Sequence, residues 1–256
     1  MIYKFLPYKI FCLLFGDRRK FGTQAVPDDP DFLRWKQNYM RFYLETQKGT
    51  IGRVVNHFGF RIMRNMNLTG KSILEIGPGI IEHMQYTSTK PEKYILCDTN
   101  REMLIKSEEI LRKKDIPIVR SIEVKGVDIP LADNEVDVII TFHQLEHVHN
   151  LERHLKEIKR VLKPNGTLVG SVPAEGGFAW GFGRFLTSRR YAKRVLKVHY
   201  DKIICWEHPN FVDKIRKALN QEFSHVESVK KPFSFLPLDM NLSFSFIYKN
   251  DKKLCG

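Results

Sequence analysis

A chain of 256 residues with 43% hydrophobic and 12% aromatic residues can bury a substantial core, and its length suits one large α/β domain. Its four cysteines lie far apart, without a C-x-x-C pair or a metal-type spacing to histidine, so the sequence indicates neither a disulfide framework nor a zinc ribbon and favours a reducing, cytoplasmic setting. The net charge of +13 lies at the two ends of the chain, because residues 71–172 are nearly neutral whereas residues 1–70 and 173–256 each hold an excess of seven cations. This distribution favours anionic partners such as phosphorylated substrates, nucleic acid or an anionic membrane.

The chain begins with an apolar run over residues 1–15, which two lysines and a proline interrupt. This run is too short and too broken to span a bilayer, and the charged residues 17–20 that follow do not resemble the cleavage site of a secretory signal. We expect the run to dock on the domain. A peripheral membrane foot with basic flanks is the alternative.

Two helices are expected next, over residues 31–48 and 51–66 with a break near Gly49. The first helix carries four aromatic residues: Trp35, Tyr39, Phe42 and Tyr43. Residues 1–70 are therefore expected to form a helical cap on the domain that follows.

From residue 71 onwards, short β-rich apolar runs alternate with polar stretches of helical period, which is typical of a mostly parallel, doubly wound sheet. Strands are predicted over residues 72–76, 94–97, 118–127, 136–142 and 167–172. The helices expected between these strands cover residues 101–114 and 151–162, and the second is stopped by residues 164–166. A helix over 209–220 and an antiparallel pair of strands near 226–229 and 242–248 complete a domain over residues 71–256.

The first predicted strand leads directly into a glycine turn, Ile73-Leu74-Glu75-Ile76-Gly77-Pro78-Gly79. Missing Cβ atoms let a backbone approach a ligand closely at the carboxyl end of the sheet. The full dinucleotide pattern G-x-G-x-x-G is absent, because position 82 is glutamate. Asp98 ends the second strand, where a carboxylate can accept both hydroxyls of a ribose, and Asp128 follows the third. A role in a turn or a helix cap can explain each aspartate alone. It does not explain why the glycine turn and the two aspartates follow one another in this order.

Over about residues 70–173 the chain resembles the class I S-adenosylmethionine-dependent methyltransferases, especially the broad group called type 11. The matching segments are residues 74–79, 97–98, 127–130, 145–148 and 160–168. The resemblance implies an α/β fold with a Rossmann-like, seven-stranded, mostly parallel sheet and helices on both faces. The implied cofactor is S-adenosylmethionine, with S-adenosylhomocysteine as the product. One departure is Ile81, where the family often has a third glycine.

The same resemblance implies which residues contact the cofactor. Glu75 and the glycines would face the methionine moiety, Asp98 would hold the ribose, Asp128 and Ile129 would meet the adenine, and His143 would line the floor. The full predicted set is Glu75, Gly77, Pro78, Gly79, Asp98, Thr99, Asp128, Ile129 and His143.

Residues 143–147 also match H-x-x-E-H, the pattern with which zinc peptidases place two histidines on one helix face. His143 closes the β-rich run 136–142, so the two histidines should not share a helix face. We therefore predict no metal site.

Methyl transfer to a hydroxyl requires alignment, a water-poor pocket and a base. Histidines near the carboxyl edge of the sheet are the candidates, because a pKa near neutrality suits hydroxyl deprotonation. His147 is the first choice by position and His208 the second. A structural role is the alternative for each.

After the fifth strand, an insertion over about residues 174–208 is expected to bind the substrate. Its aromatic, glycine-rich start is followed by the cations Arg189, Arg190, Lys193, Arg194 and Lys197. An aromatic lid beside cations suits an acceptor with a sugar or apolar face and a phosphate, whereas a solvated basic helix is the plainer interpretation. The portion from residue 176 to 210 is similar to methyltransferases of bacterial surface-polysaccharide and lipid-linked glycan synthesis.

We therefore expect O-methylation of a sugar on a nucleotide-linked or lipid-linked glycan, in the cytoplasm or peripherally at the inner face of the membrane. The alternatives are methylation of RNA or of another small molecule, and a noncatalytic adenosine-cofactor-binding module. The residues after the fourth strand, Thr141-Phe142-His143-Gln144, are not the Asp/Asn-Pro-Pro-aromatic motif of enzymes that methylate base amino groups, so nucleic acid is not favoured. Glu82 disfavours a nicotinamide dehydrogenase.

Overall fold

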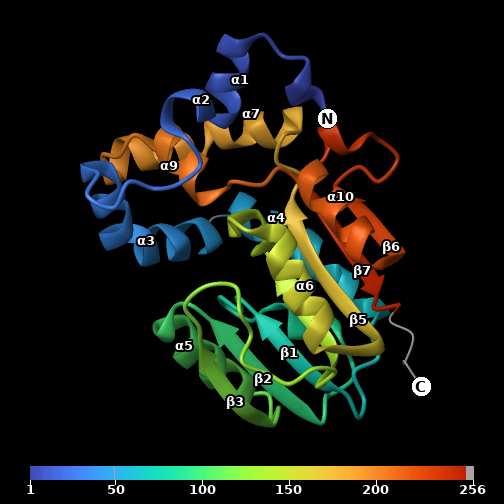
Figure 1. Ribbon diagram of the computed structural model, residues 1–256. Coiled ribbons are helices and arrows are strands. Elements are labelled where there is room, and N and C mark those ends of the chain that lie inside the picture. Colours follow the sequence, from blue (N-terminus) through green and yellow to red (C-terminus); the bar gives the residue numbers. More distant parts are fainter. Residues whose placement is uncertain (49, 252–256) are drawn as a thin grey trace.

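The computed structural model describes residues 1–48 and 50–251, so the predicted break at Gly49 and Cys255 lie outside the described residues. A seven-stranded sheet runs through the molecule in the order β3-β2-β1-β4-β5-β7-β6 (Figure 1). All neighbouring strands are parallel except the pairs that β7 makes with β5 and β6. The predicted Rossmann-like, mostly parallel sheet is confirmed. Its strands are β1 Ser72–Ile76, β2 Lys93–Asp98, β3 Ile118–Glu123, β4 Val136–Phe142, β5 Leu162–Pro173, β6 Ser224–Lys231 and β7 Ser243–Lys249.

Helices cover both faces of the sheet because β1, β2, β4 and β5 are apolar on both sides. On one face, a buried cluster joins these strands to α6 (Leu151–Val161) and α10 (Val212–Glu222). On the other face, a second cluster joins them to α5 (Arg101–Arg112) and the end of α4 (Thr50–Phe60). The expected helical layers on both faces are thus present.

Several predicted boundaries differ from the structure, among them the third strand, which was predicted over 118–127 and ends at Glu123. α4 ends at Phe60 and continues only as the 3-10 turn η2 (Arg61–Asn65), so the helix predicted over 51–66 is shorter. β5 begins directly after α6, although residues 164–166 carry turn signals. The buried Asn250 side chain explains this, because it donates to the carbonyl oxygens of Lys159, Leu162 and Lys163 and holds the chain in place.

The N-terminal segment docks on the domain as expected. α1 (Tyr8–Phe15) packs against α7 (Phe178–Leu186), with Leu14 and Phe15 buried against Phe211. The buried Arg184 of α7 ties the two helices together, because it donates to the carbonyl oxygens of Leu13 and Leu14 and pairs with Asp201. No helix among the described residues is long and apolar enough to cross a membrane.

The insertion between β5 and α10 is helical and joins the N-terminal helices in one lobe at the end of the molecule (Figure 1). Trp35 of α3 is buried in this lobe against Ile203 and Trp206 of α9. The lobe is made by α1, α2 (Arg18–Phe21), α3 (Pro30–Lys48), α7, α8 (Ser188–Tyr191), the π-turn η5 (Ala192–Leu196) and α9 (Tyr200–Glu207). The predicted cap and the predicted insertion are therefore packed as one unit.

Candidate active site

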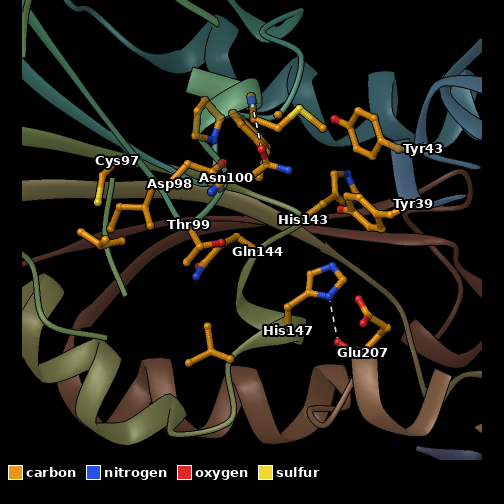
Figure 2. A pocket seen from close by; sticks show the side chains of 18 of the residues that line it. Tyr39, Tyr43, Cys97, Asp98, Thr99, Asn100, His143, Gln144, His147 and Glu207 are labelled. Carbon is orange, nitrogen blue, oxygen red and sulfur yellow. Dashed lines mark hydrogen bonds between the residues drawn. The ribbon is translucent and has the colours of Figure 1, made fainter. Parts of the chain in front are cut away.

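A cavity of about 1030 Å³ opens at the carboxyl ends of β1, β2 and β4. Tyr39 and Tyr43 of helix α3 lie at one side of it (Figure 2). The loops that follow these strands supply residues 76–80, 97–100, 142–144 and 147–150 to its wall. Carboxyl ends of neighbouring parallel strands meet at one edge of a sheet, which brings the predicted turn and the predicted aspartates together.

The glycine turn after β1 is fixed by close contacts. Gly77 and Gly79 have φ values of +66° and +55°, which favour glycine. A Cβ atom on Gly77 would lie 2.8 Å from the Gln144 side chain, and one on Gly79 would collide with the Tyr43 hydroxyl. The Tyr43 oxygen accepts a hydrogen bond from Ile80 N at 3.1 Å. These contacts leave no room for a side chain on either glycine.

Glu75 lies behind this turn and is only 1% exposed. Its carboxylate accepts a hydrogen bond from the Tyr94 hydroxyl at 2.5 Å and lies 3.6 Å from His83 Nδ1. Burial raises the pKa of Glu75 to about 8, although the Tyr94 hydrogen bond acts in the opposite direction. Glu75 is not among the described residues that line the cavity. Its predicted contact with a methionine moiety stays a prediction, and its present partners brace the turn.

Asp98 lines the cavity at the end of β2, as do the neighbouring Thr99 and Asn100. Burial raises the pKa of the Asp98 carboxyl, and hydrogen bonds from the backbone of Asn100 and Thr99 partly offset this. One of these bonds joins Asn100 N to Asp98 Oδ1 at 2.8 Å. The carboxylate is thereby held at the cavity wall, in the position that suits the hydroxyls of a ribose.

Asp128 and Ile129 line the cavity as predicted, but the atoms expected to meet an adenine have partners within the protein. The Asp128 carboxylate, 72% exposed, accepts from Arg153 Nη2 at 2.6 and 2.9 Å. Ile129 N donates to Glu157 Oε2 at 3.2 Å. The adenine contacts therefore remain a prediction, which requires at least one of these pairs to open.

His143 lines the cavity at the end of β4 with a φ of +53°. Its Nδ1 lies 3.7 Å from Glu146 Oε1, and its buried Nε2 has no hydrogen-bond partner within the described residues. His143 directly follows strand β4, whereas His147 belongs to the 3-10 turn η4 (Leu145–His147), so the two histidines do not share a helix face. In the described part of the chain, no group of three or more His, Cys, Asp or Glu side chains is placed to hold a metal ion.

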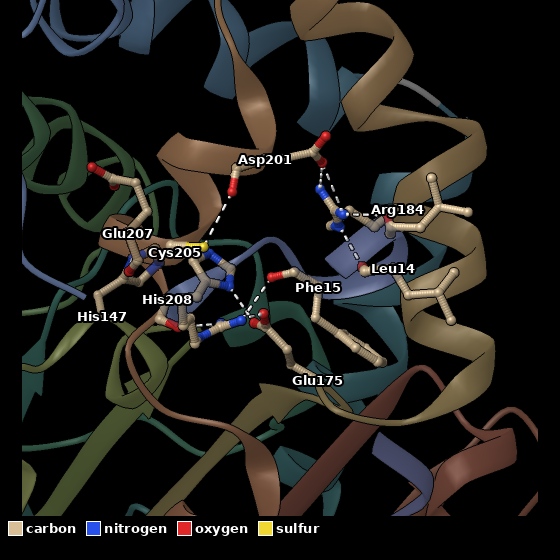
Figure 3. Close-up of polar contacts among 11 residues, drawn as sticks. Leu14, Phe15, His147, Glu175, Arg184, Asp201, Cys205, Glu207 and His208 are labelled. Carbon is tan, nitrogen blue, oxygen red and sulfur yellow. Dashed lines mark hydrogen bonds and ion pairs between the residues drawn. The ribbon is translucent and has the colours of Figure 1, made fainter. Parts of the chain in front are cut away.

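The two histidines predicted as base candidates, His147 and His208, are in contact, with ring centroids 4.6 Å apart. His147 lines the cavity, and its Nδ1 donates to the carbonyl oxygen of Glu207 at 2.8 Å (Figure 2). His208 lies behind it, and its Nδ1 lies 2.6 Å from the buried carboxylate of Glu175 (Figure 3). Arg18 also reaches this carboxylate, at 3.4 Å. A chain of polar groups thus runs from the cavity to Glu175.

The environments of the two histidines move their pKa values apart. Burial, followed by the nearby charge of His208, lowers the pKa of His147. Burial alone would also lower the pKa of His208, but the charge and hydrogen bond of Glu175 outweigh it and raise that pKa. Of the two rings, His208 therefore holds a proton more readily than His147. Opposed pKa values of this kind are typical of acid–base sites.

Aromatic residues of helix α3 cover the cavity, although the sequence alone did not show that they would line it. Trp35, Tyr39 and Tyr43 of α3 line it, whereas Glu207 is the insertion residue that does so within the described chain. The lid expected from the aromatic start of the insertion is therefore supplied by α3 instead. Glu175 was not identified from the sequence, because its partner His208 is 33 positions away.

The central part of the chain is similar to known methyltransferases. Residues 74–170 match the family model of a methyltransferase domain. An uncharacterized methyltransferase of Schizosaccharomyces pombe is 39% identical over 99 residues, which are 38% of this chain and 37% of that protein. A demethylmenaquinone methyltransferase of Corynebacterium efficiens is 25% identical over 100 residues, which cover 39% and 40% of the two chains. This chain thus spans well under half the length of these curated relatives.

The fold is also found among solved structures. An S-adenosylmethionine-dependent methyltransferase from Mesorhizobium loti superposes with a TM-score of 0.53 at 15% identity, over 76% of this chain and 97% of that one. The sheet order and the family match agree with this arrangement. Residues 74–170 therefore match a methyltransferase domain, and this match together with the fold implies S-adenosylmethionine as the cofactor.

The described residues fit this cofactor. The positive φ values of Gly77 and Gly79 leave a turn without Cβ atoms at the cavity wall, and Asp98 presents a partly desolvated carboxylate beside it. The unpartnered Nε2 of His143 adds a polar atom to the same wall. Gly77, Gly79, Asp98 and His143 are the residues that would hold the cofactor.

Proposed function

We propose that this protein, which carries a class I methyltransferase domain, transfers a methyl group from S-adenosylmethionine to a hydroxyl group of a sugar on a phosphate-linked glycan. Both nucleotide-linked and lipid-linked glycans have the required chemistry. The observation that carries the proposal is His147, a neutral histidine on the cavity wall backed by the His208–Glu175 pair.

His147 can serve as the base because its tautomer is fixed. The carbonyl oxygen of Glu207 can only accept, so Nδ1 carries the hydrogen and Nε2 keeps its lone pair. When bound, S-adenosylmethionine supplies a methyl group from a sulfonium. As the acceptor oxygen gains that methyl group, its proton passes to His147 Nε2.

The pair behind His147 sets its protonation. The charge on His208 lowers the pKa of His147, after the larger effect of burial, so the base is neutral before an acceptor arrives. Glu175 balances the charge on His208 in the interior and fixes the orientation of its ring. We infer that His208 and Glu175 position and tune the base, whereas His147 meets the acceptor.

The walls of the cavity suit a sugar linked to a phosphate. Trp35, Tyr39 and Tyr43 offer aromatic surface against which the apolar face of a sugar can pack. Lys36 and Arg53, which also line the cavity and are exposed, provide positive charge for a phosphate.

A second candidate acceptor is an aromatic ring compound of the quinone type. It is favoured by the aromatic wall and by the similarity, over 39% of this chain, to a demethylmenaquinone methyltransferase. RNA and a noncatalytic adenosine-binding role have no comparable support in the cavity.

The test incubates the purified protein with methyl-labelled S-adenosylmethionine and, separately, nucleotide sugars, lipid-linked glycans, demethylmenaquinone and RNA. We expect label in a glycan as a methyl ether, identified by mass spectrometry. The label should be lost in His147→Ala and kept in the matched control His225→Ala, which changes an exposed histidine on the edge strand β6. Label in RNA alone, or equal transfer by His147→Ala, would overturn the proposal.

A further inference from the structure

The lobe at the end of the molecule has an apolar outer face on two adjacent helices. α7 exposes Phe178, Phe182 and Leu186, which are spaced four residues apart and therefore follow one stripe of the helix. The rings of Phe178 and Phe182 stack in the open, with centroids 5.9 Å apart and planes within 8°. Buried Gly181 and Arg184 show that α7 uses a different face to hold α1.

Helix α1 adds a second apolar stripe beside the first. Leu14 and Phe15 face inward, and a Cβ on Gly181 of α7 would lie 2.7 Å from the Phe15 ring, so the two helices are in close contact. Ile10 and Leu13 are left exposed on the outside of α1, together with Phe5 just before it, which is 84% exposed.

A loop near the C-terminal strands extends this face. Phe233 and Phe235 are exposed, and the second is 81% exposed. The loop is joined to the N-terminal segment because Ile2 N donates to Asp239 Oδ1 at 2.5 Å, and the turn η6 (Leu238–Met240) packs against α7. Residues 5–13, the outer stripe of α7 and residues 233–240 thus lie at the same end of the molecule, and we call them the apolar end surface (Figure 1).

Cations accompany this surface. Residues 1–20 carry five cations and one carboxylate, and residues 178–197 carry six cations and no carboxylate. Four of these cations pair with carboxylates from other segments: Lys4, Arg18, Arg184 and Arg189. Arg190, Lys193 and Arg194 are exposed, and within the described chain none of them has an acidic partner.

The carboxylates near this surface are already engaged. Asp17 accepts from the Tyr8 hydroxyl at 2.5 Å and from Lys20 N at 3.0 Å. Asp213 pairs with Lys4 at 2.7 Å, and Asp239 accepts from Ile2 N. An anionic partner would therefore meet cations rather than free carboxylates here.

We propose that the apolar end surface binds an anionic membrane, with its aromatic and aliphatic side chains in the headgroup boundary and its cations on lipid phosphates. Exposed large apolar side chains rimmed by lysine and arginine are typical of interfacial binding. A second copy of this chain would bring the same excess of positive charge against itself, which disfavours a dimer through this face. The inference depends on neither the cofactor nor the acceptor proposed above.

The geometry also relates this surface to the candidate active site. Helix α7 carries Trp180 with its ring centroid 6.1 Å from that of His208. Arg18, just after α1, donates to the carbonyl oxygens of Phe15 and His208. The helices that would touch lipid are thus packed directly against the residues behind His147, and a lipid-linked acceptor would be held close to the cavity.

The test measures co-sedimentation of the full-length protein with vesicles of equimolar phosphatidylcholine and phosphatidylglycerol, and with vesicles of phosphatidylcholine alone. We expect binding to the anionic vesicles only, weakened by added salt. Phe178→Ser/Phe182→Ser should weaken it about tenfold, because two apolar side chains no longer enter the boundary. The matched control Ile105→Ser/Val119→Ser, which changes two equally exposed apolar residues on α5 and β3, should bind like the wild type.

A charge series tests the second half of the proposal. Arg190→Glu, Lys193→Glu and Arg194→Glu should each weaken binding at least about fivefold, the worth of one cation at an anionic surface. Lys113→Glu and Lys114→Glu, after α5, serve as controls that should leave it unchanged. The proposal would be overturned if the protein did not bind vesicles, or if the test and control variants lost binding equally. It would also be overturned if size-exclusion chromatography showed a dimer that Phe178→Ser/Phe182→Ser dissociates while no vesicle binding is seen.

Discussion

Replacing Glu175 with glutamine removes one charge from the buried pair behind His147 while keeping the size of the side chain. The carboxylate is fully buried, 2.6 Å from His208 Nδ1 and 3.4 Å from Arg18 Nη2. Removing one partner of a buried pair costs about 3–5 kcal/mol. Because the glutamine oxygen can keep one hydrogen bond, we expect the lower end, about 3 kcal/mol, or a fall in Tm of about 6–12 °C.

The effect of this substitution should depend on pH. Although burial opposes it, Glu175 raises the pKa of His208, which is about 6.5 in an unfolded chain. The pair therefore contributes its full stability below about pH 6.5 and loses it as the pH rises through the raised folded pKa. The Tm difference between the wild type and Glu175→Gln should be largest below about pH 6.5 and should shrink above the raised pKa, leaving the smaller Arg18 contribution.

The assay is thermal unfolding followed by circular dichroism across this pH range. Glu102→Gln is a suitable control, because Glu102 pairs with Lys106 at the exposed surface of α5 and its loss should cost less than about 1 kcal/mol. A Tm difference for Glu175→Gln that is the same at every pH, or no difference at all, would refute the assignment of a charged His208–Glu175 pair.

Three further predictions concern the cavity. Asp98→Ala should weaken S-adenosylhomocysteine binding about tenfold to a hundredfold in calorimetry, because a charged hydrogen bond contributes about 1.5–3 kcal/mol; an unchanged Kd would remove Asp98 from the cofactor site. Gly79→Ala should lower the free energy of unfolding in urea by at least about 1–2 kcal/mol, since the new Cβ sits at a φ of +55° and meets the Tyr43 hydroxyl. Adding Tyr43→Phe should restore part of the loss, and absence of any rescue would show that this contact is not its cause. His208→Gln should move the acidic limb of the kcat/KM profile to higher pH, because His147 must be neutral to act and loses the neighbouring charge that lowers its pKa; an unmoved limb would contradict the coupling.

The centre of the fold was predictable because its signals are local. β1 and β4 were expected over residues 72–76 and 136–142 and have these bounds, since each is a short apolar run that leads into a loop at the carboxyl edge. The glycine turn and Asp98 could be assigned to one edge for the same reason, as parallel strands bring their ends together. Local periodicity was therefore sufficient for β1 and β4.

The lobe was not predictable because its contacts join distant segments. An aromatic helix and an aromatic insertion both looked suited to cover the cavity, and the pattern did not reveal that Trp35 reaches the cavity while Phe178 and Phe182 face outward. Glu175 could not be identified as a site residue from the sequence, since an acidic residue after a strand is common. Only the fold places His208 beside it. The turn signals at residues 164–166 were overridden by the distant Asn250.

We propose that His147 is the base of a methyl transfer in a cavity that binds S-adenosylmethionine. The most direct test measures methyl transfer to the acceptor and S-adenosylhomocysteine binding in parallel, for the wild type and for His147→Gln. We predict that the variant binds S-adenosylhomocysteine with the wild-type Kd while transfer falls about a hundredfold or more. Unchanged transfer by His147→Gln, with cofactor binding intact, would show that His147 is not the base.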